Sequence, residues 1–173
     1  VLDVTAAPGS KATHIGVLVP SATIVAGDVH PHRVETMRRV AAKQDARIHV
    51  LIHDATKSLP FPDQSFDRVL LDAPCSGTGT LRRNPEIRYR LRPEDINELA
   101  EQQKQMLERA AAALRPGGRL LYSTCSVEPE ENESVVDHFA SHHPEFKPVD
   151  PTTALSSFIR EPSLTVGLRP RHP

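Results

Sequence analysis

Aromatic residues are scarce in this sequence: tryptophan is absent, and phenylalanine and tyrosine together make up 4% of the 173 residues. A chain with so few rings is poorly equipped to stack an extended row of nucleic-acid bases. The net charge is −1, so any nucleic-acid partner must be bound by a local basic patch rather than by a global field. No run of about 18 apolar residues occurs, which excludes a membrane-spanning helix.

Cysteine is also rare, with only Cys75 and Cys125 present, and these two form no C-x-x-C motif. This usage fits a reducing compartment better than a disulfide-rich secreted scaffold, so we predict a cytoplasmic protein. The histidine pairs 30/32 and 142/143 lack partners at ligand spacing, so we predict no metal site. The sequence also lacks the glycine fingerprints of dinucleotide-binding and P-loop proteins, which disfavours a pyrophosphate ligand.

What the sequence does contain is a regular alternation of strand and helix patterns. Strand patterns occupy residues 1–4, 22–26, 47–52, 67–71 and 119–123, and helical patterns occupy residues 11–18, 31–43, 93–114 and 129–139. Such alternation predicts an α/β fold of one domain, with a mostly parallel sheet covered by helices on both faces. The chain begins at Val1 inside a strand pattern and without a methionine, so we expect it to be a piece of a longer protein.

The loop after the first strand pattern is the first candidate binding site. Its Pro8-Gly9 turn and a helix that opens near Ser10 would direct backbone N–H groups at a small ligand. Acidic residues follow or end four of the strands, at Asp3, Asp28, Asp54 and Asp72. Such an acidic edge suits a cationic nucleoside, and S-adenosylmethionine, with its sulfonium and its ribose, fits that description. The alternative is that these aspartates only cap loops and helices.

The two cysteines each follow a buried strand pattern. If the two strands are neighbours in a parallel sheet, both thiols open onto one crevice at its carboxyl edge. Each could instead be a small core residue, or the two could be a redox pair, although no C-x-x-C supports the latter. From the residues alone, either thiol could be a nucleophile, because a cysteine ionises readily near neutral pH. Lys11 and the local N–H groups could lower the pKa of a thiol.

Three segments carry a family resemblance: Leu2–Lys11, Asp67–Gly79 with its D-A-P-C-S-G motif, and Leu120–Ser126 with S-T-C-S, followed by Glu131-Asn-Glu133. They resemble the RsmB/Sun/NOP2 family of RNA cytosine-5 methyltransferases. The similarity runs from Val1 to about Phe146. It implies a Rossmann-like class I methyltransferase catalytic domain at 1–146, lacking the last strands of that fold. We expect residues 147–173 to be a proline-rich, mostly irregular segment.

The resemblance also implies a function and a set of site residues. The reaction would be transfer of a methyl group from S-adenosylmethionine to C5 of a cytosine in RNA, in rRNA rather than tRNA, by a monomer. The implied catalytic residues are the nucleophile Cys125, Cys75 in product release, Asp72 at N3 of the base, and Lys11. The implied donor site comprises Thr5, Ala6, Ala7, Pro8, Gly9, Ser10, Lys11, Asp28, Arg33, Asp54 and Asp72. Thr5 and Ser10 depart from the family, which usually has a cysteine and a second glycine there.

Five arginines follow the Cys75 loop closely, at positions 82, 83, 88, 90 and 92. They could bind phosphates beside a target base. The alternative is a solvated face paired with Glu86, Glu94 and Asp95.

Two rival functions remain at this point. An exocyclic-amine methyltransferase would need an aromatic residue where Cys75 stands, and a non-catalytic remnant would not need both cysteines.

Overall fold

The computed structural model describes residues 1–150, and residues Val1–Phe139 form one compact unit. Residues 140–150 belong to a second unit, and the predicted irregular segment 147–173 lies outside the described residues from position 151 onward.

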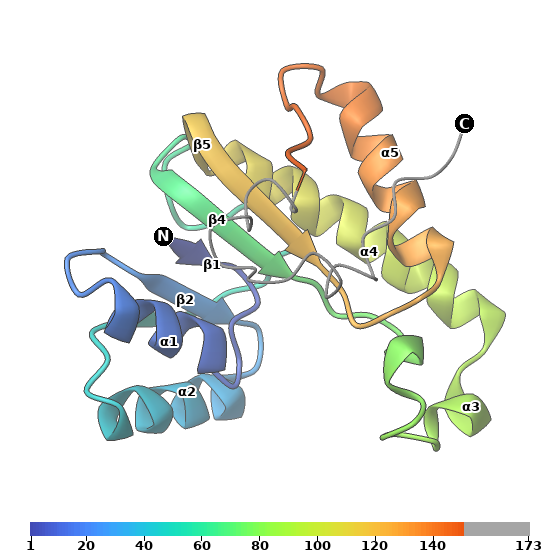
Figure 1. The fold of residues 1–173 in the computed structure, drawn as a ribbon, viewed down its shortest axis with the longest axis horizontal. Coiled ribbons are helices and arrows are strands. Elements are labelled where there is room, and N and C mark those ends of the chain that lie inside the picture. The colour runs from blue at the N-terminus through green and yellow to red at the C-terminus, as the bar shows by residue number, and fades with distance from the viewer. Residues whose placement is uncertain (151–173) are drawn as a thin grey trace, which may run out of the picture. The chain divides into compact units, whose positions relative to one another are not determined.

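A parallel five-stranded sheet in the order β3-β2-β1-β4-β5 forms the centre of the first unit (Figure 1). The strands are β1 (Leu2–Asp3), β2 (Val25–Asp28), β3 (His49–Ile52), β4 (Phe66–Asp72) and β5 (Leu114–Ser123). The chain moves outward from β1 to β3 and then returns to place β4 on the other side of β1. Ligands of open α/β sheets bind at such a reversal of strand order, beside the carboxyl ends of the strands. The site is therefore expected at the ends of β1 and β4.

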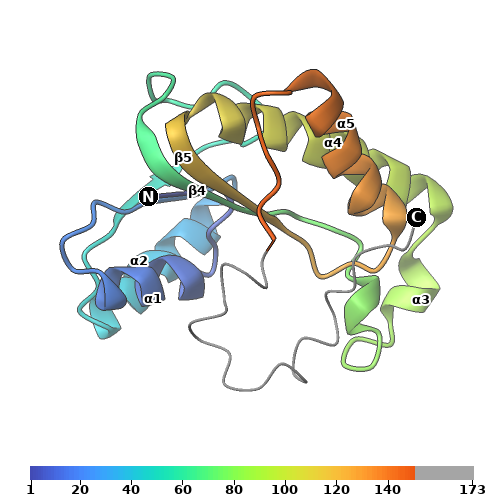
Figure 2. The ribbon, with the colours of Figure 1, turned by 45° about the horizontal axis from the view of Figure 1, so that its top comes forward.

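Helices cover both faces of this sheet, as the alternating pattern predicts. The longer helices are α1 (Ser10–Leu18), α2 (Pro31–Lys43), α4 (Pro93–Ala112) and α5 (Glu133–His142). Helices α1 and α2 lie on one face, and α4 lies on the other (Figures 1 and 2). The predicted apolar stripe of α2 is confirmed, because Val34, Met37 and Ala41 are buried. The α/β fold is confirmed with it.

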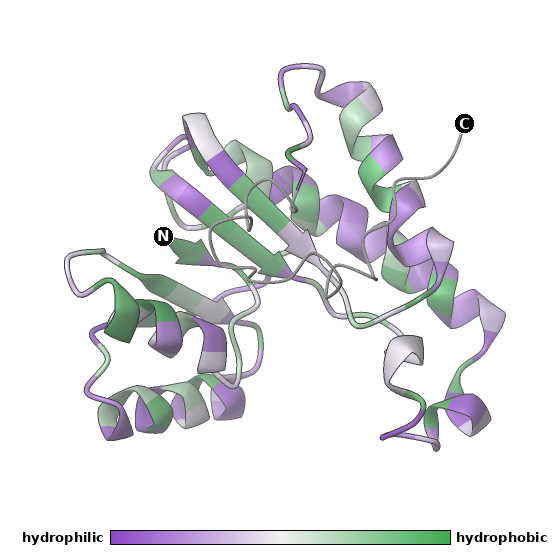
Figure 3. Cartoon of the chain, in the orientation of Figure 1, coloured by the Kyte–Doolittle hydropathy of each residue, from purple (hydrophilic) through white to green (hydrophobic). Residues whose placement is uncertain are grey.

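The strands nearest the centre carry the apolar core. Figure 3 shows apolar residues concentrated on β1, β2 and β4. In β4 the run Val69, Leu70 and Leu71 is buried without alternation, as in a strand covered on both faces. The burial of these three side chains fixes the position of Asp72, the last residue of β4.

The predicted break at Pro116-Gly117-Gly118 takes a different form from the one expected. Helix α4 ends at Ala112 rather than at 114, and β5 already begins at Leu114. Leu114 pairs with Phe66 of β4, and the pairing resumes at Arg119 opposite Arg68. Residues 115–118 are therefore a bulge inside the strand, because β4 offers pairing groups on both sides of the break.

The predicted single helix over 129–139 is wrong. A 3-10 turn, η2 (Pro129–Glu131), is separated from α5 by Asn132, whose φ of −117° and ψ of −90° are not helical. The side chain of Asn132 bonds three groups outside α5, and these bonds compete with a helical conformation. Two short elements, η1 (Thr78–Thr80) and α3 (Ile87–Arg90), were not predicted because neither is long enough to show a period. Within residues 1–150, no helix has the length and apolar character needed to cross a bilayer.

Candidate active site

The loop between β1 and α1 is a tight turn that only glycine can complete. The Ala7–Pro8 peptide bond is cis, and Gly9 has a φ of +102°. A Cβ atom on Gly9 would come within 2.7 Å of Cγ of Met37 in α2. The positive φ and the lack of space for a Cβ atom both require glycine at this position. The Gly9 carbonyl accepts a hydrogen bond of 2.8 Å from the Thr13 hydroxyl, which joins the turn to α1.

This loop lines a cavity of about 140 Å³. The lining residues are Asp3, Thr5, Ala6, Ala7, Pro8, Ser10, Lys11 and Asp72. The structure thus brings most of the predicted donor-site residues together, and Gly9 shapes the same loop. The predicted residues Asp28, Arg33 and Asp54 do not line this cavity. A cavity of this size holds only part of a nucleoside-sized ligand, so these three would have to hold the remainder outside it.

Asp3, the last residue of β1, lines the cavity; the sequence placed it on the acidic edge, but the donor set implied by the family resemblance did not include it. Its side chain is 1% exposed, and neither carboxylate oxygen has a hydrogen-bond partner among the described residues. Burial raises the pKa of Asp3 to about 7, with the positive charge of Lys11 acting in the opposite direction. An unpartnered carboxylate in a cavity fits a cationic ligand. Its place at a strand end, like those of Asp28 and Asp72, is the feature by which the sequence assigned it to the acidic edge.

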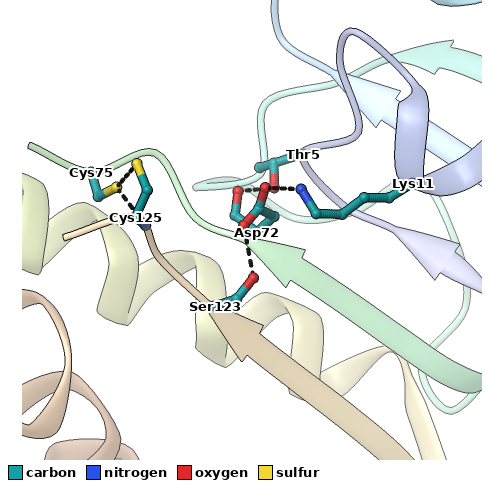
Figure 4. Close-up of polar contacts among 6 residues, drawn as sticks. All are labelled: Thr5, Lys11, Asp72, Cys75, Ser123 and Cys125. Atoms are coloured by element: carbon teal, nitrogen blue, oxygen red, sulfur yellow. Dashed lines mark hydrogen bonds and ion pairs between the residues drawn. The ribbon is translucent and has the colours of Figure 1, made fainter. Parts of the chain in front are cut away.

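Asp72 connects the cavity to the neighbouring strands (Figure 4). Its Oδ2 forms an ion pair with Lys11, and its Oδ1 accepts a hydrogen bond of 2.7 Å from Ser123 of β5. The hydroxyl of Thr5 donates to the Asp72 carbonyl at 2.9 Å. The threonine that departs from the family thus still contributes a contact at the strand end. Ser123 was not predicted, because only strand pairing brings it to Asp72.

Asp28 at the end of β2 and Asp54 after β3 form hydrogen bonds with residues that follow them closely in the chain, as loop-capping aspartates do. Asp28 is 6% exposed, and its Oδ1 accepts the N–H of His30 at 2.9 Å. The guanidinium of Arg33 lies 3.8 Å from Asp28 Oδ2. Asp54 accepts the hydroxyl of Thr56 at 2.6 Å and its N–H at 3.0 Å, and these bonds lower the pKa of Asp54. A role in donor binding stays a prediction for Asp28, Arg33 and Asp54.

The two cysteines meet beyond the ends of β4 and β5, as expected for neighbouring parallel strands. Their Sγ atoms are 3.2 Å apart, and the backbone N–H of Cys125 donates to Cys75 Sγ at 3.3 Å (Figure 4). Burial raises the pKa of the Cys75 thiol to about 11, and its hydrogen bond with Cys125 acts in the same direction. The expectation that Lys11 lowers a thiol pKa is therefore wrong for Cys75. Lys11 instead pairs with Asp72.

Hydrogen bonds join the two cysteine loops to each other. The N–H of Gly79 donates to the Cys125 carbonyl at 3.0 Å, and the hydroxyls of Ser76 and Ser126 are 3.1 Å apart. A Cβ atom on Gly79 would come within 2.8 Å of the Cys125 carbonyl oxygen. The close approach of the two loops therefore needs glycine at position 79. It also fixes the distance between the two thiols.

The arginine segment, residues 82–92, follows the Cys75 loop and is exposed. All five of its arginines are exposed. The solvated face of the alternative interpretation is thus found, but among residues 1–150 none of the five forms the expected ion pair with Glu86, Glu94 or Asp95. Tyr89 is 81% exposed, and Arg88 lies 5.8 Å from the centre of its ring.

In the described part of the chain, no cluster of His, Cys, Asp and Glu side chains could hold a metal ion.

Comparisons with known proteins agree on one family. The family model described as 16S rRNA methyltransferase RsmB/F matches residues 1–164. Ribosomal RNA small subunit methyltransferase B of Cronobacter sakazakii is 43% identical over 149 residues, covering 84% of this chain and 34% of that protein. The solved structure of PH0851 has a TM-score of 0.81 at 42% identity, covering 84% of this chain and 34% of that one.

A further solved structure, NSun6 from Pyrococcus horikoshii with SFG, has a TM-score of 0.74 at 31% identity. The alignment covers 82% of this chain and 36% of that one. The chain therefore spans about a third of the length of the proteins that it matches.

Proposed function

Because the chain belongs to the 16S rRNA methyltransferase RsmB/F family, we propose that it methylates C5 of a cytosine in RNA through a covalent bond between Cys125 and C6 of that base. The family is one of S-adenosylmethionine-dependent methyltransferases with a Rossmann-like fold. The names of the relatives support ribosomal RNA as the substrate, and we propose the cytoplasm as the location. We propose that the chain acts as a monomer.

The cavity beside β1 suits the methyl donor. S-adenosylmethionine, when bound, supplies an electrophilic methyl group on a sulfonium centre. The unpartnered carboxylate of Asp3 and the backbone of the Thr5–Ser10 loop would hold the polar end of such a cation. Asp28 would accept the ribose hydroxyls, and Arg33 and Asp54 would border the rest of the nucleoside. This assignment extends the acidic edge predicted from the sequence.

The contact between the two thiols is the observation that carries the proposal. Burial holds the pKa of Cys75 at about 11, so Cys75 remains a thiol near neutral pH. Its sulfur already accepts the N–H of Cys125, which leaves its S–H free to donate to Cys125 Sγ at 3.2 Å. Cys125 is the exposed member of the pair, so its sulfur is the one that a base of the RNA can reach. The arrangement therefore favours Cys125 as the attacking group.

The proposed reaction needs three acts from these side chains. Cys125 Sγ bonds to C6, which makes C5 nucleophilic enough to accept a methyl group. Asp72, in its protonated form, gives its proton to N3 of the ring during the addition and takes it back when the ring is restored, with Lys11 and Ser123 holding its carboxyl group in place. After methyl transfer a base removes the C5 proton, and the C6–sulfur bond breaks. Cys75, in contact with Cys125, assists this release.

The arginine segment is the proposed contact for RNA. Its five arginine side chains are exposed and follow the Cys75 loop, and among residues 1–150 none of them forms an ion pair with a carboxylate. They would bind phosphates next to the target nucleotide. Since the thiol must reach C6 of one base, that cytosine must be unpaired or flipped out of its helix.

Substitution of each cysteine tests the proposal. The chain is incubated with S-adenosylmethionine and a ribosomal RNA fragment, and the products are resolved on a denaturing gel and by nucleoside mass spectrometry. Cys125→Ala should abolish the covalent protein–RNA conjugate, while Cys75→Ala should accumulate it. The methylated nucleoside should be 5-methylcytidine. A conjugate that accumulates in the Cys125 variant would reverse the two roles, and methylation on the exocyclic amine would refute the proposed reaction.

A further inference from the structure

Two adjacent residues, Glu131 and Asn132, form hydrogen bonds with the residues next to the two cysteines. We propose that they are positioning residues for the thiols, Glu131 for Cys75 and Asn132 for Cys125. This inference rests on the proposed function, because it assigns each residue to one step of that reaction. Among residues 1–150, no hydrogen bond joins either residue to a sulfur atom, so both act through the neighbours of the cysteines.

Glu131 binds the residue that follows Cys75. The Glu131 side chain is fully buried, and its Oε1 accepts the N–H of Ser76 at 2.8 Å. Its Oε2 accepts the hydroxyl of Ser76. Ser76 is therefore fixed by both its backbone and its side chain.

Gln103 of α4 completes this arrangement on the other side of Cys75. Its Nε2 donates to the carbonyl of Pro74 at 2.9 Å and to Glu131 Oε1 at 3.0 Å. Gln103 is as fully buried as Glu131. Both neighbours of Cys75 are thus held by one connected pair of side chains, which fixes the direction of the Cys75 thiol.

Asn132 makes the same kind of arrangement around Cys125. Its Oδ1 accepts the hydroxyl of Thr124 at 2.7 Å, and its Nδ2 donates to the carbonyl of Ser126 at 3.1 Å. Nδ2 also donates to the carbonyl of Glu128 at 2.9 Å, which uses its second proton. The non-helical backbone of Asn132 between η2 and α5 accompanies these bonds. The break in the helix thus coincides with the residue that holds the nucleophile loop.

The cost of burying the Glu131 carboxylate indicates a role other than stabilising the fold. A buried carboxylate without a cation is costly, and among residues 1–150 no lysine or arginine pairs with Glu131. Only neutral donors surround its oxygens. An apolar side chain at this position would avoid that cost, but it could not fix Ser76. The need to orient the Cys75 loop through Ser76 explains why a carboxylate, that of Glu131, lies at this buried position.

The test compares Glu131→Gln and Asn132→Ala in the full chain, with Glu130→Gln and Asn97→Ala as exposed controls. Glutamine keeps the size of Glu131 but turns one acceptor into a donor facing Ser76. We expect Glu131→Gln to slow release, so that the covalent conjugate accumulates about tenfold, because a charge-assisted bond from the Ser76 hydroxyl becomes a neutral bond that this hydroxyl must accept. Asn132→Ala should slow conjugate formation by about tenfold without changing donor affinity. The controls should behave as the parent chain does.

A second measurement does not depend on methyl transfer. Alkylation by iodoacetamide, mapped to each cysteine by mass spectrometry, should change at Cys75 in the Glu131 variant and at Cys125 in the Asn132 variant. This selectivity supports the positioning roles even if the product is not 5-methylcytidine. Equal changes at both thiols, or none, in protein that still binds donor would overturn the inference.

Variants of the bonded partners keep the test valid if Asn132→Ala does not fold. Thr124→Val conserves shape but removes the hydroxyl, which donates to Asn132 Oδ1 and also accepts the N–H of Ser126, and Thr124→Ser restores both bonds. We expect the valine variant to reproduce the slow addition and the serine variant to recover it. Equal rates in the valine and serine variants would contradict the role of Asn132.

Discussion

Asp3 combines complete burial with a carboxylate that no donor satisfies. Burial raises its pKa from 3.8 to about 7. Between about pH 4 and pH 7, Asp3 therefore carries a proton in the native chain but has lost it in the unfolded chain. Since stability falls with rising pH wherever the native state binds more protons, this residue destabilises the fold at and above pH 7. Because a buried, unpartnered carboxylate costs stability, its presence in the cavity supports a role in ligand binding.

Asp3→Asn should remove that pH dependence. We expect the melting temperature of the variant to exceed that of the parent by about 5 °C at pH 8, with a smaller difference at pH 5. S-adenosylmethionine should bind the variant more weakly, because the carboxylate charge is lost. Thermal melts from pH 5 to pH 8 and calorimetry with the donor measure the two effects. Asp63→Asn, an exposed change, is the control, and a parent melting curve that does not depend on pH would contradict the assignment.

Asp28→Ala should weaken binding of S-adenosylmethionine by about 1.5–3 kcal/mol, the range for a hydrogen bond to a charged group. Because Asp28 Oδ1 also accepts the N–H of His30, the alanine variant loses a local cap as well. Asp28→Asn keeps an acceptor for that N–H and separates the two effects. Calorimetry that gives one donor affinity for parent and alanine variant would exclude Asp28 from the donor site.

At the scale of elements, the important contacts join loops that follow neighbouring strands. The β4 loop carries Cys75 and the β5 loop carries Cys125, and the pairing of β4 with β5 brings them together. The first loop reaches the same place because β1 is the other neighbour of β4. The carboxyl ends of three strands thus supply the donor cavity, Asp72 and both thiols.

The arginine segment should bind RNA through its charges. Replacing Arg82 and Arg88 by glutamine should weaken binding and reduce the slope of log affinity against log salt by about 1.4, at about 0.7 for each lost phosphate contact with a single strand. Filter binding between low and moderate salt measures this slope. Glutamine at Arg38 and Arg39, which are exposed on α2, is the matched control. An equal loss in both double variants would indicate only a general charge effect.

At the scale of the molecule, the chain offers little else to attract RNA. Its net charge is −1, and it spans about a third of the length of the relatives that it matches. Among the described residues, β5 has only β4 as a neighbour, and Leu121 on β5 is 60% exposed. An uncovered strand edge favours association and lowers stability.

We therefore predict that the 173-residue chain binds the donor measurably but methylates RNA more slowly than a full-length relative. A weak global attraction for RNA and an open strand edge are the physical reasons. Turnover of both proteins on the same ribosomal RNA fragment, with melting temperatures measured in parallel, tests this. Equal rates would show that these residues are sufficient for the reaction.

The sequence determined the features that depend on local pattern. Alternating strands and helices predicted the α/β fold, and the bounds of α2 were predicted correctly because Pro31 and the apolar stripe mark it. The motifs around Cys75 and Cys125 predicted two thiols at one edge, since parallel strands end together.

Tertiary structure decided what depends on neighbours distant in the chain. Burial between strands left Asp3 without partners and raised the pKa of Cys75, and neither effect is visible in a pattern of residue types. Ser123 reaches Asp72 only through the pairing of β5 with β4. The helix predicted over 129–139 breaks at Asn132, where bonds to Thr124 and two carbonyls compete with local helix propensity.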